Sequence, residues 1–296
     1  MSQSPRGVVV ISGATSGIGL ACALDLCARG FTVVAGGRDP GAIAALERQA
    51  VTGLVPCRLD VTDDASIETA LNRARSLSSD SGLAGLVNNA GVSLVGPLEL
   101  QPLDALRAML EVNVTGAVRL TQQALPALRR ARGRVVFMGS IAGRSALPFL
   151  GGYSASKYAI EAIGDALRVE IAPWGLHVAI VEPGAIDTPI NGKALESFDA
   201  VASTAAAQAR YGRAMAAFRR QMTTTIGHAL PPATVAAAVA HALTAKRPRT
   251  RYVVGRDARE RVWLKRLLGD RLHDRAVRMV IGLPEHATDV AGADDP

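Results

Sequence analysis

The sequence predicts an α/β fold built on one doubly wound parallel sheet, with helices on both faces and a helical extension at the C-terminus. Short apolar runs alternate with longer segments of helical periodicity along most of the chain, and this alternation is typical of βαβ units. A glycine-rich turn joins the first apolar run to the first helical segment. Neither a repeat of fixed period nor a low-complexity linker interrupts the pattern before about residue 190. We therefore expect a single sheet without an internal domain boundary.

The first strand is expected at residues 8–11, where consecutive β-branched apolar residues indicate a strand buried on both faces. Leu20, Leu24 and Cys27 then recur at helical spacing and predict the first helix. Later apolar runs alternate with helical segments in the same way. Further strands are expected at residues 32–35, 54–59, 85–87, 134–138, 177–181 and 252–254.

The turn between the first strand and the first helix holds three glycines, Gly13, Gly17 and Gly19. The first backbone N–H groups of a helix lack partners and carry the positive end of the helix dipole. Glycine lets a phosphate approach this end closely and tolerates positive φ. The turn therefore predicts a phosphate-binding site, and the alternative is an ordinary glycine-rich turn.

Composition indicates a soluble globular protein. Hydrophobic residues make up 49% of the chain, and no window approaches the roughly 20 apolar residues of a membrane span. The N-terminus shows no charged-then-apolar secretory pattern. Cys22, Cys27 and Cys57 match neither a disulfide framework nor a metal-ligand spacing. We expect a cytoplasmic protein with reduced cysteines and no metal site.

The net charge of +7 is concentrated near the C-terminus, because residues 246–278 hold 12 Lys or Arg against 4 Asp or Glu. We interpret residues 256–296 as a basic amphipathic helical extension. One interpretation places residues 256–284 against an anionic membrane surface, and the other packs their leucines on the chain's own domain. Nucleic-acid binding is not expected, because aromatic platforms are scarce. The apolar residues at helical spacing are Trp263, Leu264, Leu267, Leu268 and Leu272.

Six short motifs follow the glycine turn, namely LDV at 59–61, NNAG at 88–91, NVTG at 113–116, GS at 139–140, YSASK at 153–157 and PGAIDT at 183–188. In this order and spacing they resemble the motif set of the short-chain dehydrogenase/reductase family, over roughly residues 6–190. The resemblance implies a Rossmann-type fold and an oxidoreductase that transfers hydride between nicotinamide and an alcohol or carbonyl. We accordingly divide the chain into a catalytic domain, residues 1–255, and the extension 256–296. The extension resembles that of the retinol and hydroxysteroid dehydrogenase branch.

Tyr153 and Lys157 are four residues apart in a helical segment, so the phenol and the ammonium share one helix face. A neighbouring cation favours the phenolate, and we expect it to lower the pKa of Tyr153 from its usual value of about 10. Tyr153 would then donate a proton to the alkoxide that develops during carbonyl reduction. A Tyr and a Lys at this spacing are otherwise an ordinary solvated helix face.

Ser140 and Asn113 complete the expected catalytic set. Ser140 follows the strand at 134–138, and strand ends of an open α/β sheet face the ligand crevice. Its hydroxyl can hydrogen-bond the substrate oxygen, although the family commonly has Ser-Ser where this chain has Gly139-Ser140. The resemblance gives Asn113 the role of holding a helix bend and a water near Lys157. The alternatives are that Ser140 simply ends a strand and that Asn113 is a turn residue.

The second strand leads into GGRDP, where cofactor choice is usually decided. Arg38 can pair with the 2′-phosphate of NADP and stack on adenine, and Gly37 stands where NAD-using relatives have Asp. Asp39 could instead bind the ribose, or it could cap the helix expected to begin near Pro40. We expect NADP as the preferred cofactor, with NAD as the alternative.

The resemblance also assigns the remaining cofactor contacts. The LDV motif is expected beside adenine, NNAG along the ribose and nicotinamide, and PGAIDT at the carboxamide. Ser12 replaces the usual Thr but keeps the hydroxyl. The full expected cofactor set is Gly13, Thr15, Ser16, Gly17, Ile18, Gly19, Arg38, Asp60, Val61, Asn88, Ala90, Gly91, Tyr153, Lys157, Pro183, Gly184 and Thr188.

Residues from about 190 to 230 form a helical stretch where the family has a variable substrate lid. Its apolar side chains suggest an apolar alcohol or ketone, such as a steroid, retinoid or similar lipid-like carbonyl, and the alternative is packing for stability. The resemblance implies a homodimer or homotetramer. A catalytically silent cofactor-binding protein, or a membrane-surface protein, is the competing function. The apolar residues concerned are Phe198, Val201, Tyr211, Met215, Phe218 and Met222, with Leu94, Leu147, Pro148 and Phe149.

Overall fold

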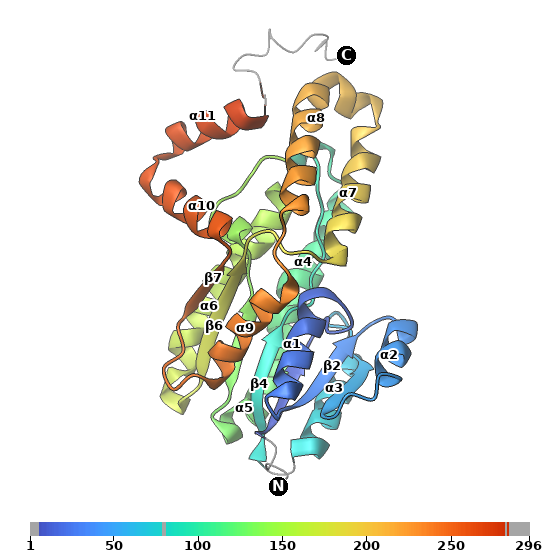
Figure 1. The fold of residues 1–296 in the computed structure, drawn as a ribbon, viewed down its shortest axis with the longest axis vertical. Helices are drawn as coiled ribbons and strands as arrows, with labels where there is room; N and C mark the ends of the chain where they lie inside the picture. The colour runs from blue at the N-terminus through green and yellow to red at the C-terminus, as the bar shows by residue number, and fades with distance from the viewer. Residues whose placement is uncertain (1–5, 79–80, 282, 284–296) are drawn as a thin grey trace.

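The computed structural model describes residues 6–78, 81–281 and 283. Its strands are β1 (Val8–Ile11), β2 (Thr32–Gly37), β3 (Leu54–Arg58), β4 (Leu83–Asn88), β5 (Arg134–Met138), β6 (His177–Pro183) and β7 (Arg251–Val254). They form one sheet in the order β3-β2-β1-β4-β5-β6-β7, and all neighbouring strands are parallel. Helices cover both faces of the sheet (Figure 1). The predicted fold class is confirmed.

Every expected strand is present, and the differences lie at the strand ends. β2 continues through Gly36 and Gly37, two residues past the expected end. Both glycines are buried, and they pair with Cys57 and Arg58 of β3. Glycine has no side chain to contribute to an apolar run, so the pattern of hydrophobic residues ends before the strand does.

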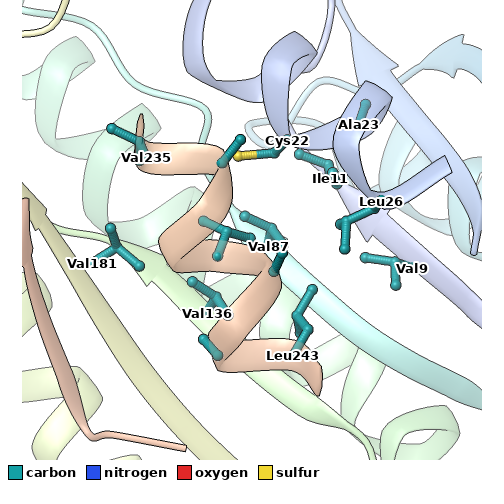
Figure 2. Close-up of a cluster of buried hydrophobic side chains, with 14 of the residues drawn as sticks. Val9, Ile11, Cys22, Ala23, Leu26, Val87, Val136, Val181, Val235 and Leu243 are labelled. Atoms are coloured by element: carbon teal, nitrogen blue, oxygen red, sulfur yellow. The ribbon is translucent and has the colours of Figure 1, made fainter. Parts of the chain in front are cut away.

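The helices that cover the sheet are α1 (Gly17–Ala28), α2 (Pro40–Glu47), α3 (Asp64–Ser78), α5 (Gly116–Ala131), α6 (Gly151–Ile171) and α9 (Pro232–Thr244). Side chains of β1 alternate between two cores: Val9 and Ile11 face one, while Val8 and Val10 face the other. The first core lies between the sheet and the pair α1 and α9, and Figure 2 shows Leu243 of α9 within it. The second core lies under α3, α5 and α6. Both faces of the sheet are therefore closed to solvent.

Helix α4 (Leu103–Leu110) does not run straight into α5. A π-helical turn, η3 (Glu111–Thr115), lies between them and contains the NVTG motif residue Asn113. Such turns locally widen a helix and are frequent at functional sites. The other short helices are η2 (Leu98–Leu100), η4 (Ile141–Gly143) and η5 (Ala172–Trp174).

The expected lid consists of two helices, α7 (Pro189–Ala202) and α8 (Ala205–Gly227), which stand together at the top of Figure 1. They pack around an aromatic cluster. The ring centroid of Phe149 lies 5.3 Å from that of Phe218 and 6.4 Å from that of Phe198. Phe149 precedes α6 and has a φ of 65°. The lid thus has a small core of its own, joined to the loop that leads into α6.

The C-terminal extension is helical as expected and forms two helices, α10 (Arg256–Leu267) and α11 (Asp270–Ile281). The helical pattern ends at Leu268, whose backbone is extended (φ −83°, ψ 125°), and Gly269 follows. Arg261 donates from Nη2 to the carbonyl oxygen of Ser145 at 2.7 Å, and Ile281 is buried in the core of the lid. One side of the extension therefore packs on the chain's own domain.

The other side of the extension leaves large apolar side chains exposed. Residues 282 and 284–296, which include the end of the expected membrane-contact segment, lie outside the described residues. No helix within the described ranges is both long and apolar enough to cross a bilayer. The exposed apolar residues of α10 and α11 are Trp263, Leu264, Leu267, Leu272, Met279 and Val280.

Strand order determines where a ligand can bind. From β1 the chain runs outward through β2 to β3, and it then crosses back to β4 on the other side of β1 and continues to β7, so the crossovers change direction beside β1. In open parallel sheets such a switch opens a crevice at the carboxyl ends of the strands. The residues that follow β1 and β4 are therefore brought to the same crevice.

Candidate active site

A cavity of about 420 Å³ lies at the carboxyl ends of the central strands. It joins the glycine turn after β1, the NNAG segment after β4 and the start of α6. Most residues expected to bind cofactor or to act in catalysis line this one cavity. They are Gly13, Thr15, Ser16, Gly17, Ile18, Arg38, Asp60, Val61, Ala90, Gly91, Ser140, Tyr153, Lys157, Pro183, Gly184 and Thr188.

The glycine turn has the geometry of an anion cradle. Gly13 and Gly17 have φ values of +65° and +53°, and a Cβ on Gly13 would lie 2.9 Å from the Cα of Ala90. Ser16, the N-cap of α1, makes no capping hydrogen bond, and the first turn of α1 has no acidic residue. The first amides of α1 can therefore receive a phosphate, with the positive end of the helix dipole behind them. These residues fit the diphosphate of a dinucleotide.

Three expected residues, Gly19, Asn88 and Asn113, are not part of the cavity lining. A Cβ on Gly19 would lie 2.2 Å from the carbonyl oxygen of Gly13, so glycine is required for α1 to pack against its own turn. Asn88 donates from Nδ2 to Oγ1 of Thr121 at 2.8 Å and ties β4 to α5. Motif spacing identified Gly19 and Asn88 as site residues, but it does not show whether a residue reaches the cavity or packs beneath its lining.

Asn89, which the sequence analysis did not select, connects the two halves of the crevice. Its Nδ2 donates to the carbonyl oxygens of Ser12 and Gly13 at 3.0 and 2.9 Å. In return, Oγ of Ser12 accepts from the backbone N–H groups of Asn89 and Ala90 at 3.1 and 3.0 Å. The sequence could have indicated Asn89, because it lies in the NNAG motif between the selected residues Asn88 and Ala90. The hydroxyl of Ser12 acts here as a structural acceptor.

The end of β2 separates the roles of Arg38 and Asp39. Asp39 caps α2, because its Oδ1 accepts from the N–H of Gly41 at 2.8 Å. Arg38 is exposed on the cavity wall. A Cβ on Gly37 would lie 2.3 Å from Cγ2 of Thr15, so a larger residue at position 37 would require the Thr15 side chain to move.

Asp60 lies close to Arg38 in the cavity. Partial burial raises the pKa of Asp60, but hydrogen bonds from Thr62 and the positive charges of Arg38 and Arg58 more than offset this, so the pKa falls below its usual value. Oδ1 of Asp60 accepts from the backbone and from the hydroxyl of Thr62 at 3.0 and 2.8 Å. Asp60 is therefore ionised and held in place.

Tyr153, Ser140 and Lys157 meet where α6 begins above the end of β5. Burial raises the pKa of Tyr153 above its usual value, and a hydrogen bond with Ser140 opposes this. Nζ of Lys157 lies 5.7 Å from the ring centroid of Tyr153 and donates to the carbonyl oxygen of Met138 at 2.9 Å. The expectation that Lys157 lowers the pKa of Tyr153 is therefore wrong for this structure, because burial of the phenol dominates.

Asn113 lies in the π-helical turn η3 and is 2% exposed. Its Oδ1 accepts from the N–H of Val92 at 2.8 Å, and its Nδ2 donates to the carbonyl oxygen of Val92 at 2.9 Å and to Oγ of Ser156 at 3.1 Å. A Cβ on Gly91 would meet both Oδ1 of Asn113 and Nζ of Lys157, at 3.4 and 3.8 Å. Asn113 thus fixes the segment that separates it from Lys157.

The PGAIDT segment after β6 is held from two sides. The backbone N–H of Ala185 donates to Oδ2 of Asp257 on α10 at 3.3 Å. Thr188 precedes α7, and its Cγ2 lies 3.2 Å from the Cβ position of Gly17. The lid also contributes to the cavity two polar residues that the sequence analysis did not select, Asn191 and Lys193.

Sequence and structure comparisons both match this chain to short chain dehydrogenases. The family model described as short chain dehydrogenase matches residues 7–198. The chain is 38% identical to "Retinol dehydrogenase 5" of Mus musculus over 268 residues, which are 86% of this chain and 82% of that protein. A short chain dehydrogenase from Burkholderia cenocepacia, solved in complex with NADP, is 26% identical with a TM-score of 0.70, covering 96% of this chain and all of that one (100%). A Burkholderia phymatum structure in complex with NAD has a TM-score of 0.75 at 24% identity, covering 90% and 95% of the two chains, and shows the shared fold.

We expect Ser12→Ala to destabilise the crevice, because two part-buried N–H groups lose their acceptor. The free energy of unfolding should fall by about 1–3 kcal/mol, measured by urea denaturation. Ser12→Thr restores the hydroxyl and should recover most of the loss. Equal stability of Ser12→Ala and the wild type would contradict the structural role of this side chain.

Proposed function

Because this chain belongs to the short-chain dehydrogenase family, we propose that it uses NADP(H) to interconvert an apolar alcohol and the corresponding ketone or aldehyde. The family relationship makes it an oxidoreductase acting on alcohol or carbonyl groups with a nicotinamide cofactor. One observation carries the site assignment: Ser140, Tyr153 and Lys157 converge on the same cavity as the glycine turn. A catalytically silent binding protein, which is the competing function, would not need these three side chains in one cavity.

The proposed mechanism assigns proton transfer to Tyr153. When bound, the nicotinamide supplies or accepts the hydride. The hydroxyl of Ser140 hydrogen-bonds the substrate oxygen and keeps it close to the phenol. The raised pKa of Tyr153 leaves the phenol protonated at neutral pH, which is the form that carbonyl reduction requires. Lys157 places a cation beneath the ring, where it stabilises the phenolate that forms as the proton leaves.

The preference for NADP rests on the end of β2. Asp39 is engaged as a helix cap, and residue 37 is a glycine packed against Thr15, without a carboxylate. Neither position is therefore available to bind a ribose diol through a carboxylate. Arg38 is exposed on the cavity wall, and its guanidinium suits a 2′-phosphate. The similar Burkholderia cenocepacia structure contains NADP, which supports the proposal.

We propose an apolar substrate because apolar side chains flank the catalytic pair. Val92, Val112 and Met138 line the cavity together with Ser140 and Tyr153. The lid adds Pro189 and Ile190 to the lining, whereas its aromatic residues pack against one another. Substrate contact and packing for stability are therefore divided between different residues of the lid. A lipid-like carbonyl, such as a retinoid or a steroid, agrees with the name of the mouse relative.

The domain division, the oligomeric state and the site of action are also proposed, from the family and the composition. The catalytic domain comprises residues 1–255, with the lid at about 190–230, and residues 256–296 are an extension. We propose a homodimer or homotetramer, which light scattering on the purified chain measures. We propose a cytoplasmic site of action, in agreement with the free thiols of Cys22, Cys27 and Cys57.

The exposed side of the extension carries the proposal of membrane contact. Trp263 and Leu267 of α10 are 65% and 60% exposed, and Met279 of α11 is 76% exposed. Arginines lie between these apolar residues along both helices. An apolar surface with interspersed cations is complementary to a bilayer that contains anionic lipids. We therefore propose that α10 and α11 hold the enzyme against such a surface.

Tyr153→Phe should lower turnover by roughly 10²–10⁴-fold, because the proton donor is lost. Cofactor affinity should change little, since the ring remains. Steady-state reduction of a panel of apolar ketones and aldehydes with NADPH measures the first effect, and fluorescence titration measures the second. Tyr158→Phe, on an exposed position of the same helix, is the matched control. Retained turnover in Tyr153→Phe would exclude this residue as the acid.

Arg38→Ala should weaken NADPH binding by roughly ten- to a hundredfold, the usual effect of losing a charge-assisted hydrogen bond. NADH has no 2′-phosphate, so its affinity should stay the same. Titration of both cofactors into the wild type and the variant measures the difference. Arg48→Ala, at the opposite end of α2, controls for the loss of one positive charge. Tighter binding of NADH than NADPH by the wild type would contradict the proposed preference.

A variant with Trp263→Ser and Leu267→Ser should lose most of the binding of the full chain to vesicles with anionic lipid, because the inserted apolar area is removed. Sedimentation with vesicles measures the bound fraction, and neutral vesicles should bind less in every case. Val169→Ser replaces an equally exposed apolar residue of α6 (69%) and serves as control. No difference between the two variants would contradict membrane contact through α10.

A further inference from the structure

A cluster of charged groups that the proposed reaction does not use lies behind Lys157, between α6, β6 and β7. Glu161, one helical turn after Lys157, is 7% exposed, and Glu182 on β6 is fully buried. Nε of Arg251 on β7 lies 3.0 Å from Oε2 of Glu161 and 3.2 Å from Oε1 of Glu182. Nη1 of Arg144 lies 3.1 Å from the same oxygen of Glu182. The two carboxylates thus share one guanidinium in a buried setting.

Each carboxylate keeps one buried oxygen without a hydrogen-bond partner among the described residues, Oε1 of Glu161 and Oε2 of Glu182. Oε1 of Glu161 points to the end of β5, where a Cβ on Gly139 would lie 3.0 Å from it. Because residue 139 is glycine, no side chain from this position reaches the oxygen. A buried, unpaired carboxylate oxygen is unfavourable unless a positive charge acts on it.

Lys157 brings a positive charge to the same end of β5. Its ammonium is buried, with the side chain 6% exposed, and its hydrogen bond goes to the neutral carbonyl of Met138 at 2.9 Å. The ammonium and the unpaired oxygen of Glu161 therefore lie against consecutive residues, Met138 and Gly139. They also project from successive turns of one helix face.

The electrostatic effects on the two groups agree with this placement. Burial lowers the pKa of Lys157 to about 8, and the charge of Glu161 opposes that decrease. Burial and the like charge of Glu182 raise the pKa of Glu161, while Arg251 and Arg144 lower it. The protonation of Lys157 thus depends on how much negative charge Glu161 carries.

We propose that Glu161 is the positioning residue that keeps Lys157 cationic, by supplying from the next turn of α6 the negative charge that the buried ammonium otherwise lacks. Glu182 limits this effect, because its like charge competes with Glu161 for Arg251. The catalytic consequence rests on the proposed role of Lys157, whereas the electrostatic pairing does not. A matched control is available in Asp165, one turn further along α6, which lies 2.6 Å from Nη2 of Arg251 but is 42% exposed in its side chain.

The chain contains only four lysines, Lys157, Lys193, Lys246 and Lys265, so each can be followed separately. We suggest labelling the full chain with [¹³Cε]lysine and recording the pH titration of each signal by NMR, with Lys157 assigned by loss of its signal in Lys157→Met. In the wild type, Lys157 should titrate near 8, because its ammonium is buried. Glu161→Gln should lower that midpoint by about one pH unit and leave the other three lysines unchanged.

Asp165→Asn should leave the midpoint of Lys157 unchanged, because this carboxylate is 42% exposed and binds Nη2 of Arg251, whereas Glu161 binds Nε. An unchanged Lys157 in Glu161→Gln would overturn the proposal. So would an equal decrease in Asp165→Asn, because the effect would then come through Arg251 and not from Glu161.

Glu182→Gln tests the same coupling in the opposite direction and remains informative if Glu161→Gln does not fold. Removing the like charge lowers the pKa of Glu161, so that Glu161 is more fully ionised. The midpoint of Lys157 should therefore hold or rise. A decrease of the Lys157 midpoint similar to that expected for Glu161→Gln would overturn the proposal. Glu182 would then stabilise the Lys157 ammonium as well as Glu161 does, and Glu161 would have no specific role.

The pH dependence of NADPH-linked carbonyl reduction separates this inference from the proposed function. If Lys157 acts in catalysis, the alkaline limb of the turnover profile should move to lower pH in Glu161→Gln by the amount seen in the NMR titration. A shifted NMR midpoint with an unshifted turnover profile supports the Glu161–Lys157 pairing and contradicts the catalytic role of Lys157. An unshifted midpoint contradicts the pairing whatever the activity shows.

Discussion

The burial of both faces of a parallel sheet is the constraint on which the rest of this structure depends. Parallel neighbours require crossover helices, and these helices close the two faces with separate hydrophobic cores. Polar chemistry is then confined to the strand ends. The switch in crossover direction at β1 opens the crevice there, and Ser12, Asn89, Ser140 and Gly184 each follow a strand that ends at its edge.

Close packing at this edge limits which residues the cofactor can meet. The Cβ positions of Gly13, Gly19 and Gly37 all fall against backbone or side-chain atoms of the same crevice. The absence of side chains at these positions leaves the turn after β1 open to an anion, and a side chain at position 37 would meet Thr15. The proposed preference for NADP depends on these positions together with the exposed Arg38.

Helix α6 links the site to the interior of the protein. Tyr153, Lys157, Glu161 and Asp165 follow one another at intervals of four residues, so one helix face runs from the cavity through a buried charge cluster to the surface. Arg251 on β7 forms ion pairs with the last two of these residues, Glu161 and Asp165. The C-terminal extension contacts two loops beside the cavity: Arg261 hydrogen-bonds the carbonyl of Ser145, and Asp257 accepts from the N–H of Ala185. The latest parts of the sequence therefore brace the loops that surround the reacting groups.

The sequence by itself determined the fold class, the approximate strands and the helix face shared by Tyr153 and Lys157, because these depend on local periodicity and on spacing along the chain. It left open the role of Asp39, and the tertiary structure shows a helix cap. Tertiary structure alone decided the direction of the pKa shift of Tyr153, the depth of Asn88, and the break between α10 and α11. The physical reason is that desolvation and close packing depend on groups brought together from distant parts of the chain. Lys157 and the Glu161 cluster depend on charges from β6 and β7, which no local pattern around YSASK contains.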